Sequence, residues 1–381
     1  VGQILVGKGE KRFYENDGKG NLSKNEEKTP PAGGMASCIL AADVDGDKDA
    51  DLFIGGRAVP GNYGLMPRSF LLRNDGDGRW TDISEEQLGN CGMVTDAAFS
   101  DTDADGDLDL LVIGDWLPVM HFENQNGRFL FSKKQTQKPF SGWWTCLEPA
   151  DLDADGDMDF VLGNWGLNTK FKATNERPLT MYVKDFDKND KSEFVLNWYP
   201  PLDDQPWPFA GKLDMTAQVP SLKKKALKFE DYAHLTYETM FDEAQRKGAI
   251  EHKANWLQSA VLWNDGATFR LEALPLEAQV APAFGIAVED FDGDGAKDIW
   301  LGGNFYGLKP EVGRHDSSRG VFLKGDGKGG FEYLPPARSG IFVAGEVRDA
   351  AVFKTKNGAG ILVARNDAEA VFFGKETFGE R

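Results

Sequence analysis

Residues 101–109 read DTDADGDLD, with an aspartate at every second position. In a β-strand, side chains two residues apart point to the same face, so these carboxylates would repel one another. In a helix the same residues would scatter around the axis without any gain. The alternation is expected where the chain wraps a cation, because the side chains then converge on it. The stretch therefore predicts a metal-binding turn.

The pattern occurs in four further places, as DVDGDKDAD from Asp43, DLDADGDMD from Asp151, DFDKNDKSE from Asp185 and DFDGDGAKD from Asp290. Each copy carries an oxygen-bearing side chain at positions 1, 3, 5 and 9. Ca²⁺ takes about six to eight oxygen ligands, and glycine at position 6 of three copies allows a sharp turn. The closing acid at position 9 excludes an EF-hand, whose glutamate stands at position 12 of its loop.

A single copy could be a solvated acidic turn, but five copies in one register predict up to five Ca²⁺ sites. The predicted metal ligands are Asp43, Asp45, Asp47 and Asp51; Asp101, Asp103, Asp105 and Asp109; Asp151, Asp153, Asp155 and Asp159; Asp185, Asp187, Asn189 and Glu193; and Asp290, Asp292, Asp294 and Asp298.

Apolar, strand-like runs flank every acidic turn, and several are followed by another strand and a glycine turn, as in RSFLLRNDGDGRWTDI at 68–83. Units of four antiparallel strands repeated along a chain are typical of a β-propeller. We therefore expect an all-β fold in which residues 1–381 form one calcium-binding propeller, with 1–22 as outer strands of the closing blade. We count seven blades, and six or eight remain open if the chain ends pair differently.

The longest interval between acidic turns contains an insertion at 201–255, which we expect between the second and third strands of the fourth unit. Good helix formers and Ser221 as an N-cap predict one or two helices there. The loops 57–68 and 304–319 are also long. Because equivalent connections of a propeller leave the same face, these three elements predict a binding surface.

Composition excludes several classes of function. The net charge of −18 argues against binding to nucleic acid or an anionic membrane surface, and no apolar stretch is long enough for a transmembrane segment. The three cysteines do not make a disulfide framework, and we expect them to be buried. The chain starts within strand-like sequence. We therefore expect a piece of a larger chain or surface assembly, exported by a signal sequence upstream of Val1.

The acidic turns resemble the FG-GAP/VCBS repeats of integrin α-subunit propellers and of bacterial surface proteins. The run GMVTDAAFSDTDADGDLDLLVIGDW at 92–116 and the stretch SLKKKALKFEDYA at 221–233 are similar to large VCBS-repeat proteins of Bacteroidetes, which are related to cartilage acidic protein. The resemblance implies calcium in each acidic turn and an extracellular or outer-surface location. It implies no established activity.

The first functional expectation is a calcium-stabilised binding or scaffold module for a protein or glycan, with no catalytic residues. The four histidines form no metal or triad spacing, and no nucleotide-binding or hydrolase motif is present. The alternative is a polysaccharide-acting enzyme such as a calcium-dependent lyase, with recruited loop residues and a sugar-stacking platform. The loop candidates are Tyr63, Tyr306, His315, Arg57 and Arg319, and the platform candidates are Trp143, Trp144, Trp165, Trp198 and Trp207. A third hypothesis is that the module only organises a larger assembly.

Overall fold

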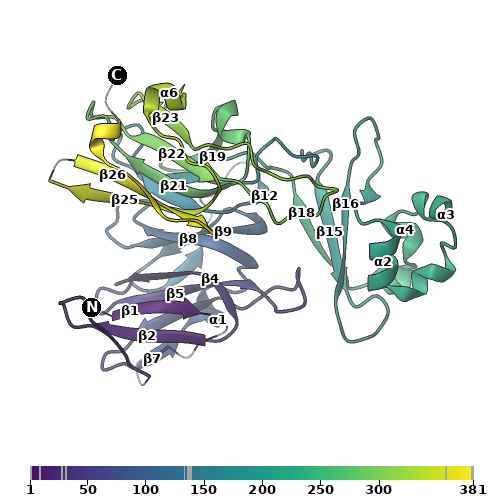
Figure 1. Ribbon diagram of the computed structural model, residues 1–381. Helices are drawn as coiled ribbons and strands as arrows, with labels where there is room; N and C mark the ends of the chain where they lie inside the picture. The colour runs from purple at the N-terminus through teal and green to yellow at the C-terminus, as the bar shows by residue number, and fades with distance from the viewer. Residues whose placement is uncertain are drawn as a thin grey trace. The chain divides into compact units, whose positions relative to one another are not determined.

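The computed structural model describes residues 2–7, 10–26, 29–30, 32–132, 134, 140–356 and 358–378. The described chain consists mainly of antiparallel strands in sheets of three to five strands, with a few short helices (Figure 1). This confirms the all-β prediction. None of the described helices is long and apolar enough to cross a bilayer. The chain divides into two compact units, one of residues 1–39, 51–94 and 171–256, the other of 40–50, 95–170 and 257–381.

The first unit begins with two antiparallel sheets. The first contains β1 (Gly2–Gly7), β2 (Glu10–Asn16) and β3 (Leu22–Lys24). The second contains β4 (Met35–Ala42), β5 (Asp51–Ala58), β6 (Phe70–Asn74) and β7 (Trp80–Asp82), followed by α1 (Ser84–Gln87). The first six residues of β5 are all buried, which is why this strand reads as a continuous apolar run instead of an alternating one.

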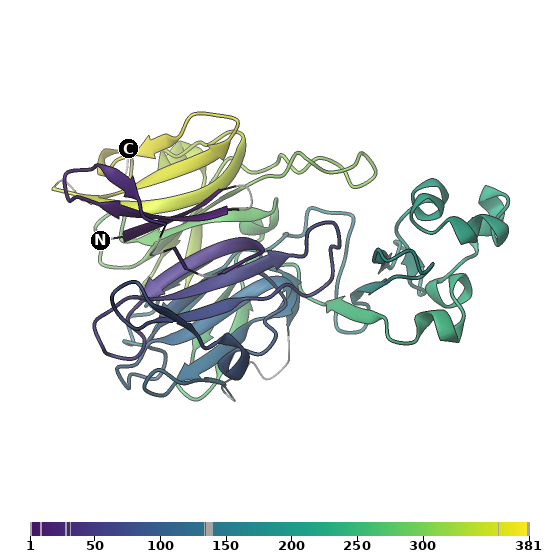
Figure 2. The same cartoon turned by 90° about the horizontal axis from the view of Figure 1, so that it is seen from below.

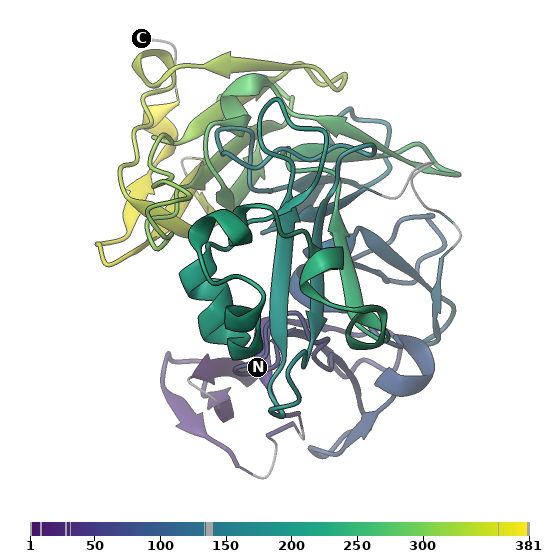
Figure 3. The same cartoon turned by 90° about the vertical axis from the view of Figure 1, so that its right-hand side faces the viewer.

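The remainder of the first unit is a sheet covered by short helices, drawn in teal and green in Figure 3. Its strand order is β17-β16-β15-β18, formed by β15 (Leu179–Lys184), β16 (Glu193–Trp198), β17 (Trp207–Pro208) and β18 (Ile250–Ala254). The helical elements are α2 (Lys212–Gln218), the 3₁₀ turn η1 (Pro220–Lys224), α3 (Phe229–Ala233), α4 (Tyr237–Met240) and α5 (Glu243–Arg246). Met215, Leu222, Met240 and Phe241 from these elements pack on Val195 of the sheet.

The second unit holds four further sheets, and Figure 2 shows its C-terminal strands in yellow. The first contains β8 (Met93–Ser100), β9 (Asp109–Pro118), β10 (Met120–Asn124), β11 (Phe129–Phe131) and β12 (Ser141–Trp143). The second contains β13 (Leu147–Ala150), β14 (Asp159–Leu162), β19 (Ala260–Asn264) and β20 (Phe269–Ala273). The third contains β21 (Ala283–Glu289), β22 (Asp298–Gly303), β23 (Val321–Gly325) and β24 (Phe331–Leu334). The last contains β25 (Glu346–Thr355), β26 (Gly358–Asn366) and β27 (Val371–Phe373). Short helical turns η2 (Leu276–Gln279), α6 (Pro336–Ser339) and η3 (Lys375–Thr377) lie between or after them.

Neighbouring sheets of the second unit share their cores. Val161 and Val261 of one sheet cluster with Ile299 and Leu323 of the next, and Trp300 from that sheet joins the core of the last one. Glycines at the ends of the second strands permit this close approach. A Cβ on Gly163 would lie 3.1 Å from the backbone oxygen of Ala283 in the next sheet, and one on Gly302 would lie 3.0 Å from Val347.

The sheet that carries the fourth acidic turn corrects the sequence-based prediction. We expected residues 259–274 to continue the fourth unit, but β19 pairs with β14, with Phe160 opposite Leu262, and β18 pairs with β15. The strands β15–β18 therefore lie within the connection from β14 to β19, together with the helices. The residues 201–255 are only part of this connection.

The pattern of burial explains this topology. Every residue of β14 and of β19 is buried, so each strand needs neighbours on both sides and on both faces. In β16, buried and more accessible residues alternate, and Phe194 is 37% exposed, so one face of this strand stays open. Asn197 of β16 also stands where β14 has Gly163 and β22 has Gly302.

The stretch 201–255 contains helices that are shorter than expected. Five short helical elements replace the one or two helices expected, and Ser221 lies inside η1, whose N-cap is Val219. At the chain ends, β1–β3 and β25–β27 pair as two separate three-stranded sheets within the described residues. The assignment of 1–22 to the closing blade therefore stays a prediction.

Candidate metal centres in the acidic turns

All five acidic turns connect the first two strands of a sheet and share one backbone conformation. Positions 4 and 6 have a positive φ in every copy, for example Ala104 (59°) and Gly106 (94°), or Lys188 (62°) and Asp190 (65°). L-residues other than glycine rarely adopt this left-handed region, and they persist there only when the surroundings enforce it. The sequence predicted the glycine at position 6 but missed the constraint at position 4, because alanine, lysine and glycine all occur there.

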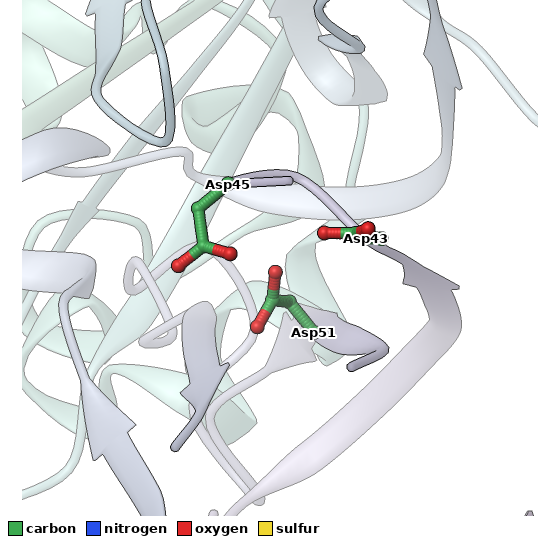
Figure 4. A group of neighbouring side chains, drawn as sticks. All are labelled: Asp43, Asp45 and Asp51. Atoms are coloured by element: carbon green, nitrogen blue, oxygen red, sulfur yellow. The ribbon is translucent and has the colours of Figure 1, made fainter. Parts of the chain in front are cut away.

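The carboxylates converge as the spacing predicts, although not as complete sets of four. One oxygen from each of three acids lies within 4.8 Å of the other two in every turn. These acids are at positions 1, 3 and 9 in the turns from Asp43, Asp151 and Asp185, and at positions 1, 3 and 5 in those from Asp101 and Asp290. Figure 4 shows the first group, in which Asp43, Asp45 and Asp51 face a common space. The predicted ligands outside these groups are Asp47, Asp109, Asp155, Asn189 and Asp298.

The acid at position 9 is buried in every turn and fastens the turn to its sheet. In Asp159, 2% exposed, one oxygen accepts the backbone N–H of Leu152 (3.1 Å) and the other that of Asn264 in the third strand (2.9 Å). Asp298 repeats this arrangement with Phe291 and Gly325, both at 3.1 Å. Position 9 is therefore a structural anchor as well as a candidate ligand.

Several buried oxygens in the turns lack a partner. Asp101 Oδ1, Asp151 Oδ1 and Asp187 Oδ1 are inaccessible to solvent and accept no hydrogen bond from the described residues. A buried carboxylate oxygen without a partner costs free energy unless a cation compensates it. The all-oxygen donor set suits a hard divalent ion, and these orphaned atoms at positions 1 and 3 point to where it would bind.

The electrostatics of the turns agree with this interpretation. Burial raises the pKa of Asp159 to about 6 and that of Asp298 to about 7, and the neighbouring carboxylates of each turn add to both shifts. Burial thus makes the charged form of these two acids costly. A bound cation would reverse the sign of this local field.

His121 on β10 is a neighbour of the second turn that the sequence did not reveal. Its Nε2 lies 2.9 Å from Thr102 Oγ1 and 3.5 Å from Asp109 Oδ2. Burial alone would raise the pKa of Asp109, but hydrogen bonds from His121 and Thr102 lower it. His121 therefore stabilises the charged form of the acid at position 9.

Two buried asparagines link successive turns, and sequence analysis missed both. Asn124 donates its backbone N–H to Asp109 Oδ1 (2.8 Å) and its Nδ2–H to the oxygen of Val44, at position 2 of the preceding turn (2.8 Å). Asn264 donates to Asp159 and to the oxygen of Thr102 in the same way (2.9 Å each). The signal was the repetition of asparagine before the glycine turns, in RNDG, ENQNG and WNDG.

We expect Asn124→Ala to destabilise the protein by roughly 2–4 kcal/mol. Besides the bond to Val44, its side chain donates to the oxygen of Leu108 and accepts the N–H of Gly127, so one buried and two partly buried backbone groups would lose a partner. Denaturant unfolding measures the change. The exposed neighbour Gln125 provides the control, since Gln125→Ala should stay within about 0.5 kcal/mol of the wild type. Equal stability of the two variants would contradict the linking role.

The residues proposed for the enzyme alternative do not assemble an acid–base pair in the described structure. His315 is 4% exposed, its Nε2 has no hydrogen-bond partner among the described residues, and its ring packs edge-on against Trp165. The Arg314 guanidinium covers the ring of Tyr306 at 3.7 Å. Arg319 donates to the backbone oxygens of Asp316 and Ser318, so it braces its own loop.

Tyr63 and Arg57 lie in the other unit. Tyr63 packs edge-on against Phe194 at 6.0 Å, and Arg57 is partly buried at the end of β5. Both side chains therefore pack within the first unit.

The candidate tryptophans pack mainly as structural residues. Trp144 is fully buried and donates its Nε1–H to the oxygen of Leu117 (3.0 Å). Trp143 and Trp165 meet edge-to-face at 5.6 Å. Trp198 pairs with Trp207 across two strands, and Trp207 donates to Asp203 (2.8 Å). The Trp143 and Trp165 rings are therefore not parallel to each other.

Fold and site together define an all-β repeat protein with a carboxylate cluster in five of its sheets. The family model of the FG-GAP-like repeat matches residues 4–54 and 101–162, which include the first three acidic turns. This match supports the FG-GAP repeat as the family of the acidic turns. The match does not show the predicted relation to Bacteroidetes proteins and cartilage acidic protein, which stays a prediction.

Comparison with known proteins gives distant structural similarities. A lectin from Agrocybe aegerita, described as specifically recognising non-reducing terminal N-acetylglucosamine, is 15% identical, with 87% of this chain and 75% of the lectin covered and a TM-score of 0.31. The V. cholerae biofilm matrix protein Bap1 is 11% identical, with 96% of this chain and 74% of that protein covered and a TM-score of 0.34. No curated protein matches the sequence.

Proposed function

We propose that the protein is a calcium-stabilised extracellular binding or scaffold module. The observation that carries this proposal is the set of buried, unpartnered carboxylate oxygens of Asp101, Asp151 and Asp187 inside converging acidic turns. Two of these turns, those of Asp101 and Asp151, lie within the FG-GAP-like repeat match.

Calcium is the proposed ion because every predicted donor is an oxygen and because the turns leave room for backbone carbonyls and water. In a turn that takes the ion, the side chains at positions 1, 3, 5 and 9 would hold it. When bound, it would neutralise the clustered carboxylates and fasten the first strand of a sheet to the second. Its proposed role is therefore structural.

The proposed location follows from the affinity expected of such sites. Extracellular calcium modules work at dissociation constants of about 10⁻⁴–10⁻³ M, which suits an environment with abundant calcium. We accordingly propose that the protein acts outside the cell or on its outer surface.

We further propose that the stacked sheets close into a propeller with six blades. This is the lowest of the three counts that the sequence left open. One of the seven predicted units, β15–β18, lies in the connection between β14 and β19, which leaves six. Closure would remove the exposed sheet edges that an open stack would leave.

The proposed ligand surface is formed by long connections that follow second strands. The loop 57–68 follows β5, the loop 304–319 follows β22, and the connection with the helices follows β14. In a propeller, equivalent connections emerge on the same side. Within the first unit, the loop 57–68 contacts the sheet formed by β15–β18. His252 Nε2 lies 2.7 Å from the oxygen of Gly64, and the Ser192 N–H donates to Asn62 (3.0 Å).

Three large apolar side chains, on α2, on α3 and in the turn before α3, are exposed and mark the place to test. Leu213, Leu227 and Phe229 are 71%, 79% and 63% exposed. Lys212 donates to the oxygen of Leu227 (2.6 Å) and lies 5.0 Å from the centre of the Phe229 ring, so these residues gather around one lysine. Apolar side chains grouped on a surface are typical of a protein-binding site.

We expect the triple variant Leu213→Ser, Leu227→Ser and Phe229→Ser to bind at least about tenfold more weakly to a ligand of the wild type. The probes are a glycan array and capture from the source cell envelope, both in calcium buffer. Leu276→Ser is the control, because Leu276 is also 71% exposed but lies on η2 in the other unit. A triple variant that binds as strongly as the control would overturn the proposed surface.

A further inference from the structure

The turn 290–298 differs from the others because the protein supplies its own cation there. The ammonium group of Lys324 on β23 forms ion pairs with Asp292 and with Asp294, the latter at 2.8 Å. These acids occupy positions 3 and 5 of the turn. Among the described residues, no lysine or arginine forms an ion pair with the acids of the turns 101–109, 151–159 and 185–193.

The hydrogen bonds of this turn are correspondingly complete. Asp290 accepts the N–H groups of Gly293 (2.7 Å) and Gly295 (3.0 Å), one on each oxygen. Asp292 and Asp294 each use one oxygen for a backbone N–H and the other for Lys324. Both oxygens of Asp298 accept backbone N–H groups, as described above. All eight carboxylate oxygens of the turn thus have a partner, whereas Asp101, Asp151 and Asp187 each keep one buried oxygen without any.

The position of Lys324 in its sheet brings its side chain to this turn. Lys324 directly precedes Gly325, the residue whose N–H binds the acid at position 9. The residues at the same place in other sheets are Arg73, Glu123 and Trp263. Arg73 is the other cation in this set, and it pairs with Asp75 in its own glycine turn (2.8 Å).

We propose that Lys324 is an internal counter-ion that replaces calcium in the turn 290–298. An ion bound at about 2.3–2.6 Å from Asp292 and Asp294 would have to displace the ammonium group, because two cations cannot share these oxygens. The turn is closed without metal, and the remaining four turns are the calcium sites. This inference rests on the proposed calcium binding and specifies which turns take part in it.

The test counts bound calcium in the wild type and in Lys324→Met by native mass spectrometry and equilibrium dialysis against calcium chloride. Lys354→Met is the matched control, since Lys354 pairs with Glu289 on the neighbouring strand (2.7 Å) outside the carboxylate cluster. We expect about four ions in the wild type and in the control, and one more in Lys324→Met, which binds calcium at this turn on the order of tenfold more tightly. Should Lys324→Met fail to fold, Lys324→Gln, which retains a polar side chain, replaces it.

A second arm measures melting in EDTA. In EDTA, Lys324→Met is expected to melt below Lys354→Met, because only the former leaves two clustered carboxylates without a counter-ion. Added calcium should remove this difference in melting temperature. Five ions in the wild type would overturn the role of Lys324 and leave the calcium proposal intact. Calcium in none of the proteins would overturn both. Equal melting temperatures of the two variants in EDTA would also overturn the internal counter-ion.

Discussion

Removal of calcium with EDTA is expected to lower the melting temperature sharply. At about 2 mM free calcium, a dissociation constant of about 10⁻⁴–10⁻³ M gives roughly 0.6–1.8 kcal/mol of stabilisation per site. Four sites would together contribute roughly 3–7 kcal/mol, which is a large part of the stability of an ordinary domain. The physical source is the relief of repulsion among clustered carboxylates, three of which keep one buried oxygen without a partner among the described residues.

Differential scanning calorimetry with a calcium titration measures this effect. Magnesium at the same concentration is the control, since it demands a smaller and more regular octahedron of ligands and should stabilise far less. A melting temperature that is unchanged after complete calcium removal would contradict the structural role of the ion.

The second large effect is expected from the anchor at position 9 of the third turn. Asp159→Ala removes the acceptor for the N–H groups of Leu152 and Asn264, and each buried donor left without a partner costs about 1–3 kcal/mol. Removal of the buried charge offsets part of this cost, so we expect a net loss of roughly 2–4 kcal/mol. Because these bonds do not involve the ion, the loss should persist in EDTA.

Asp153→Ala in the same turn is the matched comparison. Asp153 belongs to the same carboxylate group but accepts only a long backbone bond from Asp155 (3.3 Å). This variant should lose stability in calcium and match the wild type within about 0.5 kcal/mol in EDTA. Denaturant unfolding of both variants in both buffers separates the two roles. If Asp159→Ala also matched the wild type in EDTA, position 9 would be a ligand only.

The acidic turns and their flanking strands were predictable because the information is local. Nine consecutive residues form each turn, and the alternation from Asp101 to Asp109 is visible without any tertiary context. The left-handed conformation at position 4 was not visible, since Lys188 and Ala104 give no sign of it. The surrounding turn imposes that conformation on these residues.

The limits of the inserted sheet could not be predicted in the same way, because strand pairing over long sequence distances decides them. Residue 160 pairs with residue 262, and nothing in the apolar run at 259–274 specifies that partner. Asn197 stands where Gly55, Gly163 and Gly302 stand in three corresponding strands, but Ile113 occupies the same place in β9, so this position alone did not mark the inserted sheet.

The partners of the turns escaped prediction for a related reason. His121, Asn124 and Lys324 lie on third strands, well beyond the turns they contact. Their side chains reach the acids only after the sheet has formed. A comparison of the third strands among themselves, in place of the acidic turns alone, would have shown the repeated asparagine and the single lysine.

The most direct test of calcium binding in the acidic turns is anomalous diffraction at a long wavelength from crystals grown in calcium chloride. We predict peaks about 2.3–2.6 Å from carboxylate oxygens in the turns that begin at Asp43, Asp101, Asp151 and Asp185. The space between Asp292 and Asp294 should hold the Lys324 ammonium group and no peak. Anomalous maps without peaks in these four turns, at calcium concentrations of several millimolar, would contradict the account.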